Sequence, residues 1–293
     1  MKSFRQSQSA LHTWTGLLVG WVLFMIFLAG TISFWREEVN RWMRPELSVT
    51  SEVRDAGDEE RMIEGALAAL SGRAPDAASW SINMPGPRGA GVQAVWTERT
   101  PPGERRPFRW PDATNSLWVD GEGKVVPVRE TRGGDFFYRL HFDLHYMPAL
   151  WARWFVGFCS MFMLVAIVTG VITHKKIFRD FFTFRPGKGQ RSWLDGHNAT
   201  AVLALPFHLM ITYTGLVTLM TLYMPWGFLA NFENTAAAFA VTQPAVSPAR
   251  YMASPAPLAP IGPILAEARR QWGTDSMVGT LRTELADRGF TTL

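Results

Sequence analysis

The chain has 293 residues and a net charge of +4, and 47% of its residues are hydrophobic although its mean hydropathy is close to zero. This balance predicts strongly apolar segments beside an ordinary polar domain. The single cysteine, Cys159, excludes an internal disulfide and a cysteine-based zinc site.

Three stretches lack charged residues for longer than the ~20 positions that a helix needs to cross a bilayer. They predict transmembrane helices near 11–35, 149–174 and 196–226. Lys2 and Arg5 precede the first stretch as in a signal peptide, but the apolar run is too long and no small-residue cleavage site follows it, so we predict a retained helix. The predicted fold class is a mainly α-helical transmembrane bundle with three visible spans and an external α+β domain.

The connection between the second and third spans sets the predicted orientation, because short basic loops stay in the cytoplasm. Its phenylalanines favour a segment lying on the inner membrane face, with a solvated loop as the alternative. We predict a cytoplasmic N-terminus. The basic residues are Lys175, Lys176, Arg179, Arg185, Lys188 and Arg191. The predicted parts are span 1 over 1–35, an external domain over 36–140, span 2 with an external extension over 141–175, the basic loop over 176–194, span 3 over 195–226, and an external linker with a partial second unit over 227–293.

The external domain is predicted to pack one helix on an antiparallel sheet. Residues 58–71 place acidic residues in a first turn and apolar residues at helical spacing after it. Strand-like runs follow, and the last two flank an Asp-Gly-Glu-Gly hairpin signal. These runs are 79–84, 92–98, 116–120 and 124–129.

The C-terminal segment resembles a weak repeat of this opening. It has a helical pattern at 264–272 and a strand-like pattern at 277–284, after a Pro-, Ala- and Ser-rich linker at 242–263. A helix and one strand are too short to bury a core of their own. We therefore expect the natural protein to continue past Leu293, with more strands and a fourth helix.

All of the chain's histidines lie in or just beyond the predicted spans. An imidazole is an axial ligand of haem iron, and two histidines from facing helices leave no open position, which favours electron transfer over oxygen chemistry. Polar residues inside a membrane are costly and tend to be functional. His12, His174 and His197 fall near the cytoplasmic face, His208 lies inside the third span, and His141 and His145 lie on the external approach to the second span.

Two histidine spacings bear on this chemistry. His197 and His208 are eleven residues apart, so they project from one helix face about 16 Å apart in height. One helix would thus supply ligands to two haems stacked across the bilayer. His141 and His145 form an i, i+4 pair, which allows two ligands or one ligand and a neighbour.

Other interpretations of single histidines stay open. A histidine at a helix end is commonly interfacial, and His208 alone is able to hydrogen-bond a neighbouring helix. Zinc is a weaker alternative at His141 and His145, where Asp143 is the nearby acid.

The depths of the histidines limit their pairing. The three near the cytoplasmic face lie at similar depth, so two of them are able to pair. His208 lies near the centre and His145 near the outer face. These two reach one level only through tilt or kinks at Pro148 and Pro206; otherwise a partner comes from a further segment.

Four motifs resemble one known family, the PepSY-associated transmembrane or iron-regulated membrane proteins. They are Leu-His-Thr-Trp-Thr-Gly-Leu at 11–17, Arg-Leu-His-Phe-Asp-Leu-His at 139–145, Thr-Gly-Val-Ile-Thr-His at 169–174 and Trp-Leu-Asp-Gly-His-Asn at 193–198. The resemblance runs from about Ser3 to Trp226, and the motifs are specific in combination. Family members usually have a fourth helix, from which this chain departs.

The family includes inner-membrane siderophore reductases of the ferrioxamine-reductase type, with two b-type haems. The resemblance implies that the histidines of these motifs, joined by His208, are haem ligands. It also implies a bacterial inner-membrane location, a periplasmic domain, and electron flow from quinol or a cytoplasmic reductase to a ferric, hydroxamate-type siderophore. Reduction releases the iron because ferrous iron binds hydroxamate weakly.

The sequence contains no Gly-rich dinucleotide fingerprint of the Rossmann type, so we expect no direct NADPH or FAD binding of that kind, and we expect lipid but no nucleic acid as a partner. Two competing functions stay open. A transporter component is disfavoured because the spans hold few polar groups. A non-catalytic sensor or docking protein explains the external domain but not the histidines.

Overall fold

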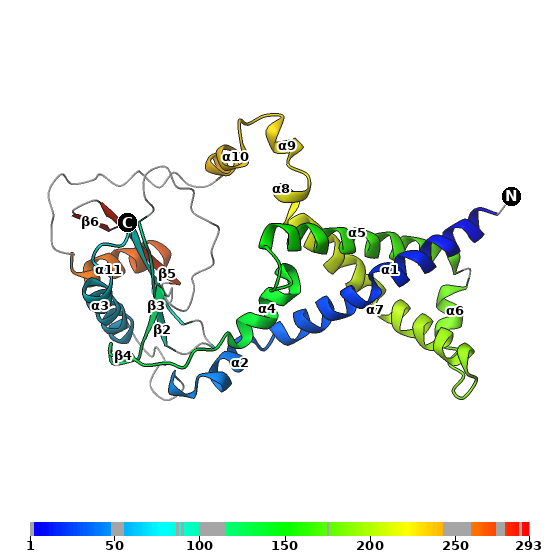
Figure 1. Ribbon diagram of the computed structural model, residues 1–293, viewed down its shortest axis with the longest axis horizontal. Coiled ribbons are helices and arrows are strands. Elements are labelled where there is room, and N and C mark those ends of the chain that lie inside the picture. Colours follow the sequence, from blue (N-terminus) through cyan, green and yellow to red (C-terminus); the bar gives the residue numbers. More distant parts are fainter. Residues whose placement is uncertain are drawn as a thin grey trace. The chain divides into compact units, whose positions relative to one another are not determined.

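The computed structural model describes residues 3–47, 56–85, 88, 91–99, 115–174, 176–242, 259–273, 279–286 and 289–292. The chain forms two compact units (Figure 1). Unit 1 comprises residues 1–34 and 136–245, and unit 2 comprises 35–135 and 246–293. The predicted fold class is confirmed, since unit 1 is helical and unit 2 holds a small antiparallel sheet.

Unit 1 is built on three long apolar helices: α1 (Phe4–Ser33), α5 (Ala149–Thr173) and α7 (Gln190–Thr218). Each is long and apolar enough to cross a membrane, as predicted. α1 begins before the predicted span because Ser3 and Gln6 form a capping box at its start. α7 continues through Pro206 and ends at Thr218, earlier than predicted.

The three long helices alternate in direction. His12, near the start of α1, hydrogen-bonds Ala166, near the end of α5, and its ring contacts His197, near the start of α7. α1 and α5 are therefore antiparallel, and α7 again runs with α1. We call this end of unit 1 the basic end, because Lys176 and the loop that follows adjoin it.

α1 and α5 pack closely through mainly small or β-branched residues. Small side chains let helix backbones approach one another, which is the usual basis of helix association in membranes. The buried residues of α1 are Thr15, Val19, Ile26 and Ala29, and those of α5 other than Gly157, which lies against Tyr223, are Ala152, Val156, Cys159 and Thr169. This seam positions the histidines on both helices.

The external extension predicted before span 2 is a separate helix and a turn. α4 (Gly133–Asp143) ends before α5 begins, and Pro148 caps the start of α5. Proline disfavours a helical residue before it. Leu144 and His145 have φ values of 48° and 53°, in the left-handed region. The remaining helices of unit 1 are α6 (Ile177–Phe181), α8 (Met220–Tyr223), α9 (Trp226–Leu229) and α10 (Thr235–Thr242).

Unit 2 contains a six-stranded antiparallel sheet in the order β4-β3-β2-β1-β5-β6. The predicted helix is α3 (Ala56–Arg73). The strands are β1 (Ser79–Asn83), β2 (Val92–Thr97), β3 (Ser116–Val119), β4 (Val125–Val126), β5 (Thr280–Ala286) and β6 (Gly289–Thr292), and α11 (Ile261–Trp272) precedes β5.

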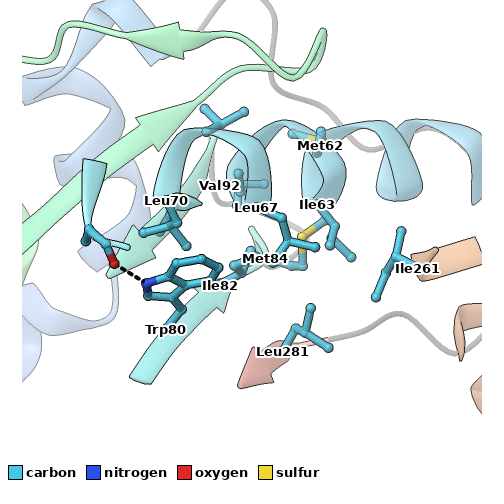
Figure 2. Close-up of a cluster of buried hydrophobic side chains, with 14 of the residues drawn as sticks. Met62, Ile63, Leu67, Leu70, Trp80, Ile82, Met84, Val92, Ile261 and Leu281 are labelled. Atoms are coloured by element: carbon cyan, nitrogen blue, oxygen red, sulfur yellow. Dashed lines mark hydrogen bonds between the residues drawn. The ribbon is translucent and has the colours of Figure 1, made fainter. Parts of the chain in front are cut away.

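The core of unit 2 lies between the sheet and its helices (Figure 2). α3 buries apolar residues at helical spacing, and β1 buries Trp80 and Ile82 at strand spacing. The Trp80 indole Nε1–H donates to the Ala74 carbonyl at 3.0 Å, which satisfies the one polar atom of this ring. The fully buried members from α3 are Met62, Ile63, Ala66 and Leu70.

The prediction that the C-terminal helix and strand cannot bury a core of their own is confirmed, because they join the core of the first unit. β5 pairs with β1 along its length, and α11 contacts α3. Ile261, Leu265 and Leu281 are buried in the same core as α3. The C-terminal segment therefore adds β5 and β6 to the sheet of the first unit. The linker predicted before it falls mostly on 243–258, which lie outside the described residues.

Replacing Arg269 with alanine is expected to destabilise unit 2. Arg269 pairs with Glu59, which is 2% exposed, so the substitution removes a cationic partner from a buried carboxylate at a cost of about 3 kcal/mol. The neighbouring Arg270 pairs with Glu267 at the surface and is the control, with an expected cost under about 0.5 kcal/mol. Hydrogen exchange of β1 and β5 in the full chain measures both. Equal protection in the two variants would show that the buried pair does not hold α11 to α3.

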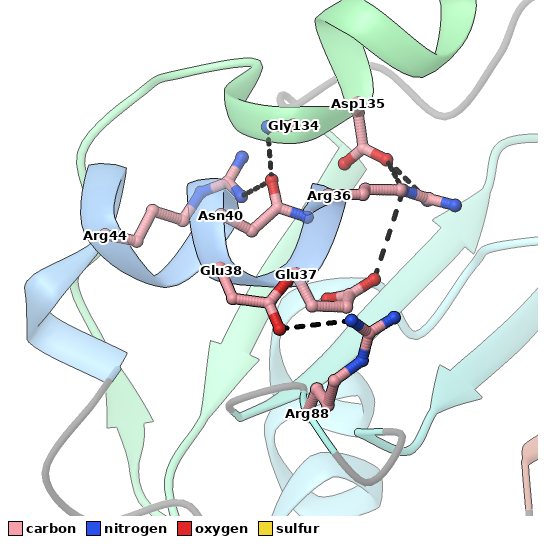
Figure 3. A network of polar contacts seen from close by, with 8 residues as sticks. All are labelled: Arg36, Glu37, Glu38, Asn40, Arg44, Arg88, Gly134 and Asp135. Carbon is pink, nitrogen blue, oxygen red and sulfur yellow. Dashed lines mark hydrogen bonds and ion pairs between the residues drawn. The ribbon is translucent and has the colours of Figure 1, made fainter. Parts of the chain in front are cut away.

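A polar network fixes α2 (Arg36–Met43) to the start of α4 within unit 2 (Figure 3). Arg36 Nε donates to Asp135 Oδ1 at 2.6 Å, and the Gly134 N–H donates to Asn40 Oδ1 at 2.8 Å. Gly134 is required by this close approach, because a Cβ there would clash with the Arg36 carbonyl oxygen. Arg88 donates to Glu38 at 3.2 Å. These contacts hold α2 against residues 134 and 135 within unit 2.

Candidate functional site

Three of the predicted site histidines gather at the basic end of unit 1. His12 lies on α1, His174 caps the end of α5, and His197 lies in the first turns of α7. The His174 N–H donates to the carbonyl of Gly170, and Gly170 touches the His12 ring. His174 Nδ1 is a buried polar atom with no hydrogen-bond partner among the described residues. The positions of these histidines along the predicted spans had placed all three at a similar depth near one membrane face.

One nitrogen of the His12 ring is hydrogen-bonded to a backbone carbonyl, and the other keeps a lone pair that is able to bind a metal. Nδ1 lies 2.8 Å from the carbonyl oxygen of Ala166. A carbonyl oxygen only accepts, so Nδ1 carries the proton, and in the neutral ring Nε2 keeps its lone pair. The Thr169 hydroxyl lies 3.5 Å from the same Nδ1. A hydrogen bond of this kind fixes the orientation and tautomer of a metal-binding histidine.

His12 and His197 face each other at a separation that suits one iron. Their ring centroids lie 6.1 Å apart, with the planes inclined at 63°. An imidazole nitrogen binds a transition metal at about 2.0 Å, which puts two rings on one ion with centroids about 6 Å apart. The pair His12 and His197 therefore has the spacing of two axial ligands.

His141 repeats the arrangement of His12 further along α1. Its Nδ1 lies 2.8 Å from the carbonyl oxygen of Ile26, so it also donates from Nδ1 and leaves Nε2 available. His208, on α7, packs edge-on against Phe27 with centroids 5.3 Å apart. Two histidines from α4 and α7 thus reach consecutive residues of α1. His141, rather than His145, shares this level with His208.

Glycines make room for both hydrogen-bonded rings. A Cβ on Gly30 would lie 2.8 Å from the His141 ring, and a Cβ on Gly170 would lie 3.1 Å from the His12 ring. A Cβ at Gly30 would therefore force the His141 ring or α1 to shift from its present position. Sequence reasoning missed both glycines. No signal in the sequence pointed to them, because each glycine lies beside a ring carried by a different helix.

His145 is not on the helix face of His141. α4 ends at Asp143, and His145 takes a left-handed backbone conformation. The premise of an i, i+4 pair is therefore wrong. The His145 ring packs between Phe136, at 4.9 Å, and Tyr146, at 5.0 Å. Within the described residues no group of three or more His, Cys, Asp or Glu side chains gathers as a metal-ion site.

A buried ion pair holds the corner between α4 and α5. Asp143 is 2% exposed, and its Oδ1 accepts from Arg153 Nε at 2.8 Å. Arg139 lies 3.6 Å from the other carboxylate oxygen. The Tyr223 hydroxyl donates to the Arg153 carbonyl at 2.7 Å, which ties α8 to the same corner. This corner positions His141. From the sequence alone, only Asp143 was noted among the residues that form the corner.

The arrangement fits haem better than a free metal ion. Haem iron needs only two axial ligands from the protein, because the macrocycle supplies the other four. His12 and His141 each donate from Nδ1 to a backbone carbonyl, and a glycine lies beside each ring. The ring centroids of His12 and His197 lie 6.1 Å apart. These features are compatible with axial ligands of haem. The structure thus brings His12 and His197 together at the basic end, and brings His141 and His208 to residues 26 and 27 of α1.

A family model described as the PepSY-associated TM region matches residues 9–290. The chain belongs to this family. The match runs from within α1 to within β6, so this PepSY-associated transmembrane protein matches its family over nearly its whole length. The resemblance seen in the four sequence motifs is thereby confirmed at the level of the family. The chain has no match among curated proteins.

Proposed function

We propose that this PepSY-associated membrane protein is a dihaem b-type cytochrome that passes electrons across the bacterial inner membrane to ferric siderophore outside. The observation that carries the proposal is the facing pair His12 and His197, 6.1 Å apart, with the His12 Nδ1 proton directed to a backbone carbonyl. Bound haem would supply a one-electron carrier whose potential depends on its axial ligands.

The chain's own residues would hold and orient the two haems. His12 and His197 would be axial ligands at the basic end, with His174 beside them. His141 and His208 would be the ligands at the level of Ile26. His197 and His208 stand about 16 Å apart along α7, so one rigid helix would link the two sites. Hydrogen bonds from Nδ1 raise the basicity of the other ring nitrogen and hold it in place.

The direction of electron flow follows from the charge of the loops. The basic end would face the cytoplasm, where quinol or a cytoplasmic reductase would donate electrons. Unit 2 would then lie in the periplasm. The site near Ile26 would pass one electron to Fe³⁺ in a hydroxamate siderophore, and the Fe²⁺ formed would leave because hydroxamate binds it weakly.

The proposal is tested with the full chain purified in detergent after expression with haem supplied. We expect a Soret band and split α bands on reduction, and rapid reoxidation when the reduced protein is mixed with ferrioxamine in a stopped-flow instrument. If haem bands appear but ferrioxamine does not reoxidise them, the siderophore is the wrong acceptor. If no haem bands appear, the cytochrome itself is rejected and the sensor or docking alternative takes its place.

A further inference from the structure

The positive charge of the chain is concentrated beside the basic end. Residues 175–195 contain six basic and two acidic residues, a net of +4, which equals the net charge of the whole chain. The other 272 residues therefore carry 23 basic and 23 acidic residues and no net charge. A segment that holds all of the net charge generates a local positive potential.

The two acidic residues of this segment do not neutralise it. Arg185 donates to both carboxylate oxygens of Asp195, at 2.7 and 2.6 Å, so Asp195 is committed to one partner, and these hydrogen bonds raise the pKa of the Arg185 guanidinium. Asp180 lies 3.7 Å from Arg179, and both are solvent-accessible. In the part of the loop that the structure describes, Lys176 and Lys188 make no ion pair.

Large apolar side chains stand among these charges. Phe178 is 72% exposed, Phe182 is 85% exposed and Trp193 is 82% exposed. Exposed aromatic rings next to the ends of membrane helices are typical of side chains at the level of lipid headgroups. Interleaved with basic residues, they are typical of segments that lie on an anionic membrane surface.

The loop is held in one shape by its own hydrogen bonds. The Ser192 hydroxyl donates to the Arg185 carbonyl at 2.5 Å, and the Lys188 N–H donates to the Ser192 hydroxyl at 2.8 Å. The Arg185 N–H donates to Asp195 at 3.2 Å. These bonds fix residues 185–188 on the first turn of α7. A preformed surface loses less entropy on binding than a flexible loop.

We propose that residues 176–195 form a binding surface for anionic phospholipid headgroups of the adjacent leaflet. The lysines and arginines attract the phosphate-bearing headgroups, and Phe178, Phe182 and Trp193 insert into the boundary with the acyl chains. The surface is independent of haem and of the siderophore. Its selectivity for anionic lipid falls as salt rises, because exposed charges are screened.

The test uses the full chain in bilayers of phosphatidylcholine that contain a trace of spin-labelled lipid. Electron paramagnetic resonance then measures the fraction of label immobilised by the protein, for phosphatidylglycerol and for phosphatidylcholine. The test variant combines Lys176→Gln, Lys188→Gln and Arg191→Gln, which spares the bond between Arg185 and Asp195. The matched control, with the same change in net charge, combines Arg73→Gln, Lys124→Gln and Arg270→Gln in unit 2, all at exposed positions.

The unmodified chain is expected to select phosphatidylglycerol over phosphatidylcholine several-fold, since each basic residue near a membrane surface contributes to the attraction. The loop variant is expected to lose most of this selectivity, and the control to keep it. Helix content by circular dichroism shows that each variant is folded. No selectivity in the unmodified chain, or an equal loss in the control, would overturn the proposal.

Discussion

Replacing His197 with alanine is expected to remove one of two haems and leave the other intact. The centroids of the His197 and His12 rings lie 6.1 Å apart, so under the proposed function either substitution would remove one axial ligand of the same iron. His12→Ala should give the same loss, and the double variant should be no worse than either single one, because residues that act as a unit have non-additive effects. The pyridine haemochrome of each purified variant measures haem per chain.

The companion variants His141→Ala and His208→Ala are expected to remove the other haem. Their rings lie at residues 26 and 27 of α1, away from His12. A combination of His197→Ala with His208→Ala should leave no haem. The pairing would be refuted if His174→Ala removed the haem at the basic end while His12→Ala retained it.

Replacing Gly30 with alanine is expected to weaken the haem site at His141. The added Cβ would lie 2.8 Å from the ring, so the ring or α1 must move. Overpacking of this kind costs about 1–3 kcal/mol, or roughly 5- to 150-fold in the affinity for haem. Haem titration of the apoprotein measures the change in affinity. The midpoint potential of the haem that still binds at His141 reports on the orientation of the His141 ring.

Gly20, on the same helix, provides the matched control for Gly30. A Cβ on Gly20 would meet nothing within 4 Å among the described residues. Gly20→Ala should therefore leave haem affinity unchanged and favour the helix slightly, since alanine has a higher helix propensity than glycine. Equal effects of Gly20→Ala and Gly30→Ala would mean that the space beside His141 is not needed for haem.

The sequence predicted the spans because charge-free length depends only on local composition. It also placed His12, His174 and His197 at one depth, which the structure confirms for the helix ends that carry them. It predicted the first strands of unit 2 from short strand-like runs and a hairpin signal. In each case the signal lies in consecutive residues.

The remaining features depend on contacts between distant residues. The break between α4 and α5 follows from Pro148 and the ion pair of Asp143 with Arg153, and a spacing rule that assumes a continuous helix misses it. The pairing of β5 with β1 joins residues about 200 positions apart. Glycines beside the histidine rings have meaning only once α1, α4 and α5 are packed.

The haem content and spin state of the full chain, purified after expression with haem supplied, test the central claim most directly. The account predicts two b-type haems per chain, both low-spin with paired imidazole ligands in the electron paramagnetic resonance spectrum of the oxidised protein. A chain that binds no haem under these conditions, or whose haem is high-spin with an open position, would contradict it.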